Sequence, residues 1–380
     1  LKLWLGSSMI LTRAFKPHTL GAMRRALQIA TQADDTEYRL RCLSAISLYH
    51  LWTGGHQAGL RTLEEFLAIA AAGDPSALPE GEVHTAIAEF FLGRLQDAWK
   101  RLDRLRRQDL RYFEGSYRVR YLADTQGLLE SVLSHVQWLM GFPDTAARTA
   151  AATLQRAHPD RHHLSFNNAL NYACPLAFWS GRDDDCKRFV DMLTQHVKQH
   201  GIVARRPVAM FYGAALACKS EQSGVECVHE LHRAVNEFRS INHLTRIGYY
   251  LGVLATALLS RGHIDEAEAA IQDAVATART QGENWCLPEV LRVQASIARA
   301  RGRTHEAEAI LGEALSLAQE TGALSWRLRA ANDLARIWCS QSRPVEARAM
   351  LAKIYEEFTE GFETSDLQVT ARLLASLAPA

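Results

Sequence analysis

Nine polar side chains from residue 168 onwards are of types that could bind an anion together. Three of them are arginines, whose planar guanidinium groups form paired hydrogen bonds with carboxylate or phosphate groups. Tyrosine and asparagine could add neutral hydrogen bonds to the same ligand. The set comprises Asn168, Asn171, Tyr212, Tyr249, Glu289, Arg292, Arg329, Asn332 and Arg336. These residues can act together only if the fold brings five separate stretches onto one surface.

The elements that would do so are repeated helical hairpins. A pair of small residues twelve positions apart recurs eight times, and a turn, most often marked by glycine, lies between the two members. The pairs are Ser47/Gly59, Ala86/Ala98, Ser134/Ala146, Cys174/Cys186, Ala215/Cys227, Ala255/Ala267, Ala295/Ala307 and Ala335/Ala347. Successive pairs start 39 to 48 residues apart. This self-similarity is typical of stacked repeat proteins, and small residues let the two helices of a hairpin approach closely.

The repeat is clearest where Gly262–Ile271 is echoed by Gly302–Leu311. Glycine closes the preceding helix, and an acidic residue suits the positive end of the next helix. This pattern resembles the tetratricopeptide repeat (TPR), stretched from ~34 to about 40 residues. We therefore predict an all-α fold, a right-handed α-solenoid of about eight TPR-like helical hairpins. One interval of 48 residues is longer than the others, and we place its extra loop in Gln108–Tyr117.

The repeat also predicts which side chains face inward. In a TPR-like solenoid the first helix of each hairpin lines the concave surface. Residues six and three before the first small residue, and one and four after it, should then face the groove. Counting from Ala295 selects Glu289 and Arg292, and counting from Ala335 selects Arg329. We expect the nine residues to form a polar groove for a small anionic ligand or an acidic peptide segment. The alternative is a solvated surface on which arginines pair with glutamates of the same chain.

Several stretches, taken in order, resemble the C-terminal TPR-like region of large bacterial regulators. They are Asp34–Arg41, Trp138–Asp144, Ala173–Pro175, Trp285–Arg292 and Leu328–Leu367. Members of that family carry a winged-helix DNA-binding domain or a nucleotide-cyclase domain, then an ATPase module, then these repeats. The resemblance implies a non-catalytic sensor or protein-interaction domain that regulates a signal-transducing ATPase linked to transcription.

The other parts of those regulators have no counterpart in the sequence. It contains no G-x-x-x-x-G-K-[ST] loop for phosphate, and no winged helix is evident. It also begins without methionine, inside an apolar helical pattern. We expect residues 1–380 to be a single solenoid, a fragment of a longer chain, with its own N-terminal ATPase module as a partner. The alternatives are a stand-alone scaffold for a protein partner, the sensor of a cyclase-linked regulator, or an enzyme.

Catalysis within these residues is not expected. The sequence lacks a G-x-S-x-G motif and a recognisable Cys/His pattern. Adjacent carboxylates such as Glu64 and Glu65 point to different parts of a helix and cannot act as a pair. We predict no catalytic residue and no cofactor.

No metal site is predicted either. His196 and His200 are four residues apart and could share a helix face, but no third ligand is evident nearby. The sets Cys227/His229/His232 and His158/His162/His163 are weaker, because Cys227 falls at a packing position and the second set flanks a loop. Surface or capping histidines are the simpler interpretation.

Composition argues against two further classes of partner. The net charge is +1, and the basic run from Lys100 to Arg111, beside Tyr112 and Phe113, is interrupted by acidic residues. We interpret the run as a solvated helix face and predict no direct contact with nucleic acid. No segment approaches the ~18 apolar residues of a membrane span. The seven cysteines include no C-x-x-C pair, which favours free thiols in a cytoplasmic protein.

Overall fold

The computed structural model describes residues 17–108, 124–157, 163–220 and 224–377. Within these ranges the regular structure is entirely helical. Eight antiparallel hairpins follow one another between a leading helix, α2 (Pro17–Gln32), and a final helix, α20 (Ser365–Ser376). The hairpins are α3 (Thr36–Trp52) with α4 (His56–Gly73), α5 (Leu78–Phe91) with α6 (Leu95–Arg106), α8 (Thr125–Leu139) with α9 (Pro143–Arg156), α10 (His163–Trp179) with α11 (Asp183–His200), α12 (Arg206–Lys219) with α13 (Glu226–Ser240), α14 (Ile247–Leu259) with α15 (Ile264–Gln281), α16 (Leu287–Ala300) with α17 (Thr304–Thr321), and α18 (Leu324–Ser340) with α19 (Pro344–Tyr355). Short 3-10 turns, η1 (Pro75–Ala77) and η3 (Val203–Arg205), precede α5 and α12.

The small-residue pairs mark the eight hairpins, as predicted. All sixteen residues are buried, each on one helix of its hairpin. Most of the intervening glycines adopt the left-handed backbone conformation that ends a helix, for example Gly262 at φ +79° and Gly302 at φ +76°. In the last hairpin Ser342 takes that conformation instead, at φ +60°. The prediction of a solenoid of about eight TPR-like hairpins is therefore confirmed.

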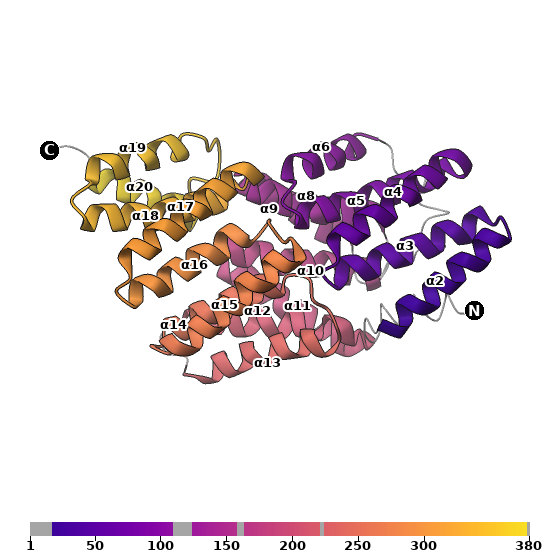
Figure 1. Cartoon of the computed structure of the whole chain (residues 1–380), viewed down its shortest axis with the longest axis horizontal. Coiled ribbons are helices and arrows are strands. Elements are labelled where there is room, and N and C mark those ends of the chain that lie inside the picture. The colour runs from indigo at the N-terminus through magenta and orange to yellow at the C-terminus, as the bar shows by residue number, and fades with distance from the viewer. Residues whose placement is uncertain (1–16, 109–123, 158–162, 221–223, 378–380) are drawn as a thin grey trace.

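The solenoid winds so tightly that its N-terminal half, the first four hairpins, touches its C-terminal half, the last four hairpins. Turns of the first three hairpins contact, in order, the segments that follow the fifth, sixth and seventh hairpins, and the third hairpin also contacts the connection after the eighth. The backbone N–H of Leu244 donates to the carbonyl of Trp52 at 3.0 Å, and that of Gly361 donates to Asp144 Oδ2 at 2.9 Å. Ser325 Oγ donates to the carbonyl of Trp138 between them. Figure 1 shows the N-terminal helices beside the C-terminal ones, with α8 to α12 passing behind.

This winding fills the middle of the superhelix with aromatic rings. The centroids of Trp179 and Trp285 lie 5.5 Å apart, and those of Trp138 and Trp326 lie 4.8 Å apart. Trp285 and Trp326 are fully buried. Each repeat of a solenoid usually contacts only the repeats next to it. Here, side chains from distant repeats share one core, so the inner surface is closed over much of its length.

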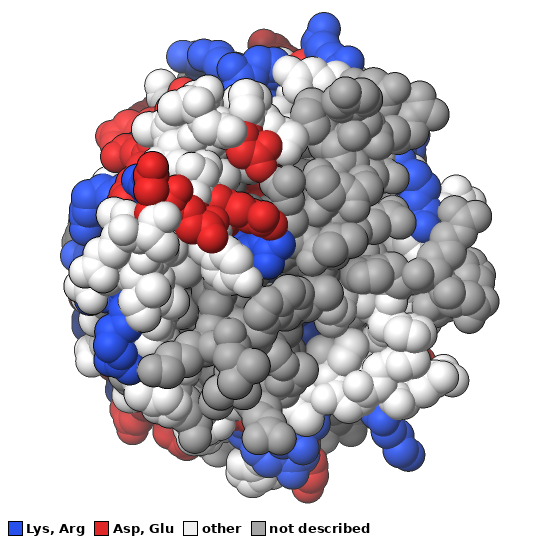
Figure 2. All heavy atoms as spheres, turned by 90° about the vertical axis from the view of Figure 1, so that its right-hand side faces the viewer, with Lys and Arg blue, Asp and Glu red and all other residues white. Residues whose placement is uncertain are grey.

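Some sequence-based expectations concern other parts of the chain. The loop expected in Gln108–Tyr117 lies outside the described residues apart from Gln108. Within the described part of the basic run, Arg101 pairs with Glu82 and Glu89. On the face drawn in Figure 2, many of the acidic side chains gather at the upper left and others lie near the edges, while most of the basic side chains lie around the margin. No described helix has the length and apolar character needed to cross a membrane.

Candidate functional site

The nine residues predicted to line the groove all lie on first helices of hairpins, but they do not form an open groove. Asn171, Tyr212, Tyr249, Glu289 and Asn332 are buried, Asn168, Arg292 and Arg329 are partly buried, and Arg336 is exposed. Five of them form a first group on α16 and α18, and the other four lie on α10, α12 and α14. Their role in binding a ligand stays a prediction.

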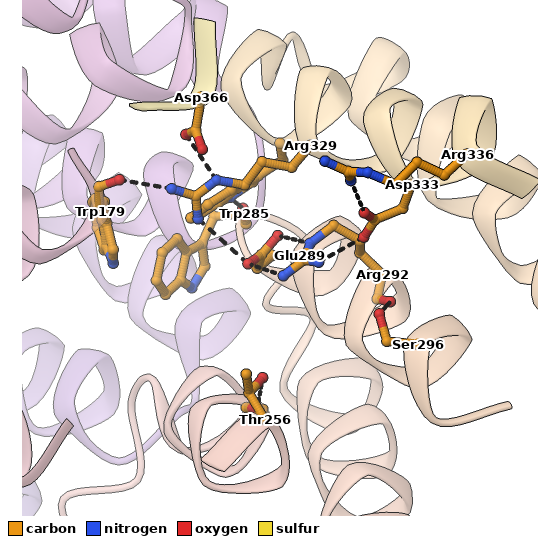
Figure 3. Close-up of polar contacts among 12 residues, drawn as sticks. Trp179, Thr256, Trp285, Glu289, Arg292, Ser296, Arg329, Asp333, Arg336 and Asp366 are labelled. Atoms are coloured by element: carbon orange, nitrogen blue, oxygen red, sulfur yellow. Dashed lines mark hydrogen bonds and ion pairs between the residues drawn. The ribbon is translucent and has the colours of Figure 1, made fainter. Parts of the chain in front are cut away.

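The first group forms an ion-pair network between α16, α18 and α20, drawn in Figure 3. Arg292 donates to both carboxylate oxygens of Glu289, at 2.8 and 3.0 Å, and to Asp333 at 2.7 Å. Arg329 donates to Asp366 at 2.8 Å and to Glu289 at 3.4 Å. We call Glu289, Arg292, Arg329, Asp333 and Asp366 the paired-arginine network.

Charges within this network satisfy one another. Burial alone would raise the pKa of Glu289, but Arg292 and Arg329 lower that pKa below its usual value. Burial alone would lower the pKa of Arg292, but Glu289 and Asp333 raise it. Arg329 also donates to the carbonyl of Trp179 at 2.7 Å and so ties the C-terminal hairpins to α10. The intramolecular pairing that the sequence left as an alternative is present at these arginines.

The other two predicted residues on α18, Asn332 and Arg336, also have partners in the chain. Asn332 exchanges hydrogen bonds with Thr370 of α20, at 2.9 and 3.1 Å. Arg336 donates to Asp333 at 2.7 Å from an exposed position.

A second group of arginines lies at the centre of the molecule, and the sequence-based prediction omitted it. Arg205 and Arg246 occupy the residues immediately before α12 and α14. Arg246 has a left-handed backbone, at φ +69°, which is unusual for a residue with a side chain. Its N–H donates to Glu283 at 2.9 Å, and the same carboxylate oxygen lies 2.9 Å from Nε2 of His56 in α4. Contacts between the two halves therefore hold Arg246 in place.

Aromatic rings surround the guanidinium of Arg246. Its Cζ lies 5.5 Å from the ring centroids of Phe91 and Tyr172, 5.6 Å from that of Trp285 and 5.9 Å from that of Trp179. Such contacts favour a cation. The residue is only 6% exposed, so the group is almost completely removed from water.

Among the described residues, neither central arginine has a carboxylate oxygen within 4.0 Å of its guanidinium. Arg205 lies over the ring of Trp52 at 5.3 Å and donates to Asn168 at a long 3.3 Å. Burial, together with the charge of Arg246, lowers the pKa of Arg205. This is opposite to the direction found for Arg292. We call Arg205 and Arg246 the central arginine pair.

Neutral groups around the pair leave hydrogen-bond donors unused. Burial, followed by the charge of Arg246, holds the pKa of His135 well below its usual value. Neutral His135 donates from Nε2 to the carbonyl of Tyr172 at 2.8 Å and accepts a 3.3 Å hydrogen bond from Arg246 at Nδ1. The buried hydroxyl of Tyr172 and the indole N–H of Trp285 have no hydrogen-bond partner. Two cations and two unused donors therefore lie close together.

A sequence signal for the central arginine pair exists, but it lies further from the first small residue of each repeat than the groove positions that we counted. Arg205 and Trp285 precede the first small residue of their repeat by ten positions, and Arg246 and Trp326 precede theirs by nine. The groove positions were taken only from within the first helix. In this solenoid the connections before α12, α14 and α16, and the first turn of α18, also point inward, because the opposite half packs against them.

Two further features lie on α11. His163 of α10 lies beside His196 and His200, so a third imidazole, which was not evident from the sequence, lies near this pair. His158 and His162 lie outside the described residues.

On another side of α11, an apolar groove of about 960 Å³ runs between α11, α12 and α13 and is lined by Val190, Met210, Ala214 and their neighbours.

Comparisons with known proteins agree on the fold. A family model described as anaphase-promoting complex subunit 5 matches residues 210–301, less than half of the chain. No curated protein matches the sequence. A Rap protein complexed with Competence and Sporulation Factor is 11% identical, with a TM-score of 0.54 over 90% of this chain and 98% of that one.

Two other solved structures are more distant in shape. NprR in complex with its cognate peptide NprX is 15% identical, with a TM-score of 0.49 over 75% of this chain and 84% of that one. A signal transduction ATPase with numerous domains and a tetratricopeptide repeat sensor, from Pyrococcus horikoshii, is 12% identical, with a TM-score of 0.44 over 88% of this chain and 49% of that one. With the repeats described above, the likeness to the Rap protein shows that this chain has a TPR-like α-solenoid fold.

Proposed function

We propose that this chain is a non-catalytic, ligand-sensing TPR-like domain, and that its central arginine pair receives an anionic group. The single observation that carries the proposal is that Arg246, which is buried, and Arg205, which is partly buried, have no carboxylate beside them in the described residues. A buried charge without a partner is costly, and a bound carboxylate or phosphate would offset that cost. Both arginines also lie at the start of a helix, where the helix dipole favours an anion.

The position of the pair suggests how binding would be sensed. Arg246 lies where the N-terminal half meets the C-terminal half, and it is held there by Glu283 and His56. An anion at this point would favour the closed packing of the two halves over any more open one. A ligand that prefers one packing shifts the population toward it, and that shift is the signal.

Three residues predicted from the sequence fit the same location. Asn168 contacts Arg205 directly, and the charge of Arg246 acts on the hydroxyl of Tyr212. Tyr249 connects this region to the paired-arginine network, because its ring lies 5.6 Å from that of Trp285 and the charge of Glu289 acts on its hydroxyl. In the proposal, Asn168 and Tyr212 help to bind the ligand, and Arg292 and Arg329 support the fold.

The ligand is either a small anion or the carboxylate of a peptide. The Rap protein of similar fold was solved with Competence and Sporulation Factor, and NprR was solved with its cognate peptide. We extend a peptide ligand to this chain as part of the proposal. The resemblance to bacterial regulators adds an ATPase module as the receiver of the signal. Seven free cysteines, five of them buried, suit a cytoplasmic location.

A thermal-shift screen of the purified chain tests the proposal. The probes are citrate, inorganic phosphate, ATP and a glutamate-rich peptide, and the variant is Arg205→Gln. Arg206→Gln is a matched control, because Arg206 is the next residue, is exposed and pairs with Glu237. We expect at least one probe to raise the unfolding temperature of the wild type and of the control but not of Arg205→Gln. Equal shifts in all three proteins would refute the assignment.

A stand-alone scaffold that binds a folded protein remains the second candidate. The apolar groove between α11, α12 and α13 favours it, because exposed apolar surface often marks a protein interface. Absence of a shift with every probe, together with loss of partner binding in Met210→Glu, would favour this function over ligand sensing.

A further inference from the structure

The histidine cluster between α10 and α11 is independent of the central arginine pair. His163 is the first residue of α10, and His200 is the last residue of α11. The two helices form one hairpin, so these residues meet at its open end, opposite the turn at Gly181. His196 lies one helical turn before His200 on the same face.

The spacing of the three imidazoles is close to that of a metal site. One nitrogen atom from each ring lies within 4.8 Å of the other two. Tetrahedral zinc with Zn–N bonds of 2.0–2.1 Å would place its ligand nitrogens about 3.3 Å apart. Small side-chain rotations would close that difference, because His163 is exposed and His200 is only partly buried.

Hydrogen bonding prepares His196 to be a ligand. Its Nε2 lies 3.0 Å from the backbone carbonyl of His163 and must donate to it. The neutral ring then carries a lone pair on Nδ1. Metal-bound histidines commonly donate their second ring nitrogen to a carbonyl or carboxylate in this way, which fixes the tautomer and the ring orientation. Burial and the two neighbouring histidines lower the pKa of His196, which favours the neutral form of its ring.

The three histidines are not members of an ion pair with the described residues. The rings of His163 and His200 stack with centroids 3.8 Å apart, so two cationic rings there would repel one another. Three imidazoles with nitrogens within 4.8 Å of one another suit zinc and neighbouring divalent transition metals better than calcium or magnesium, which prefer oxygen ligands.

We propose that His163, His196 and His200 form a binding site for a divalent transition-metal ion, with zinc as the best fit. Three protein ligands leave a fourth position for water or for a side chain of a partner. The ion joins the beginning of α10 to the end of α11 and so closes the open end of the fourth hairpin. Its stabilising effect is local to this hairpin and needs no anion at Arg205 or Arg246.

The test uses the full chain, stripped of metal with a chelator and then titrated with zinc chloride. We expect one zinc ion per chain and an upward shift of the unfolding temperature. Cobalt chloride should give the visible absorption of a four-coordinate site. His163→Ala and His200→Ala each remove a ligand from an accessible position, and each should weaken zinc binding at least tenfold.

The matched control is the double variant His229→Ala/His232→Ala. Those two histidines are exposed and three residues apart on α13. This control should bind zinc as tightly as the wild type. Circular dichroism of each variant verifies that the helices are intact. The proposal is overturned if the wild type binds no stoichiometric zinc, or if the control loses as much affinity as His163→Ala and His200→Ala.

Discussion

The paired-arginine network and the central arginine pair place the same residue type inside the same solenoid, but they differ in what balances the charge. Arg292 contacts carboxylates on two helices, and its pKa is raised. Arg205 contacts an amide and an aromatic ring, and its pKa is lowered. Burial acts on both arginines, so the carboxylates are the source of the difference.

The comparison separates a structural role from a binding role. A buried ion pair with its hydrogen bonds made needs no further partner, and it fixes how neighbouring helices meet. A buried cation without a carboxylate is unfavourable unless another group supplies the charge. The central arginine pair is therefore the place where an external anion would stabilise the folded chain most.

The largest effect is expected from breaking the paired-arginine network. Arg292→Met keeps most of the side-chain volume but leaves Glu289 and Asp333 without their main partner. Removing one member of a buried pair typically costs about 3–5 kcal/mol. Chemical denaturation should show that loss. Arg336→Met removes an exposed arginine of α18 that also pairs with Asp333. It should change the free energy of unfolding by less than about 0.5 kcal/mol. Similar values for both variants would contradict the structural role.

The two regions should also respond to acid in different pH windows. The folded pKa of His135 lies well below 6.5, so the unfolded chain takes up a proton that the folded chain does not. Stability should therefore fall below pH about 6.5, with a slope of up to about 1.4 kcal/mol per pH unit from this group. His135→Gln should reduce that slope in unfolding measurements between pH 7 and 5.

Glu289 follows the rule for a depressed carboxylate. Its folded pKa lies below the ordinary value, so its contribution is fully present above pH about 4.3 and is lost as pH falls through the folded pKa. Glu289→Gln should leave the slope between pH 7 and 5 unchanged. A flattened slope in that window would show that the two regions titrate together.

The smallest effect is expected from Arg205→Met without an anion. The variant removes a partly buried charge that has no carboxylate partner among the described residues and keeps an apolar stem over Trp52. Replacing buried charges by apolar groups is often neutral or stabilising, so the free energy of unfolding should be unchanged or about 1 kcal/mol higher. Equilibrium denaturation in a low-salt, phosphate-free buffer measures it. A loss above about 2 kcal/mol would mean that Arg205 already has an adequate partner.

Local patterns made the fold predictable. The pairs Ala255/Ala267 and Ala295/Ala307 are buried within their hairpins because glycine turns and small residues act over a dozen positions. The same offsets select Glu289, Arg292 and Arg329, and these residues lie on first helices of hairpins. A repeat pattern specifies each hairpin and its immediate neighbours, so these features can be read from sequence.

The site was less predictable because it depends on contacts between distant repeats. The pairing of Arg329 with the carbonyl of Trp179 spans 150 residues, and that of Arg246 with His135 spans 111. No local signal shows how tightly a solenoid winds, so the closed interior was not foreseen. The histidine cluster was missed for a related reason, because His163 meets His196 and His200 only when α10 and α11 fold back on each other.

The most direct test of the two roles compares Arg205→Met and Arg292→Met with the wild type, with and without an anion. The measurement is the free energy of unfolding in the presence of citrate, or of the strongest probe from the thermal-shift screen. We predict that the anion stabilises the wild type and the already weakened Arg292→Met variant, and that it leaves Arg205→Met unchanged. Stabilisation that is kept in Arg205→Met and lost in Arg292→Met would contradict the account and place the ligand in the paired-arginine network.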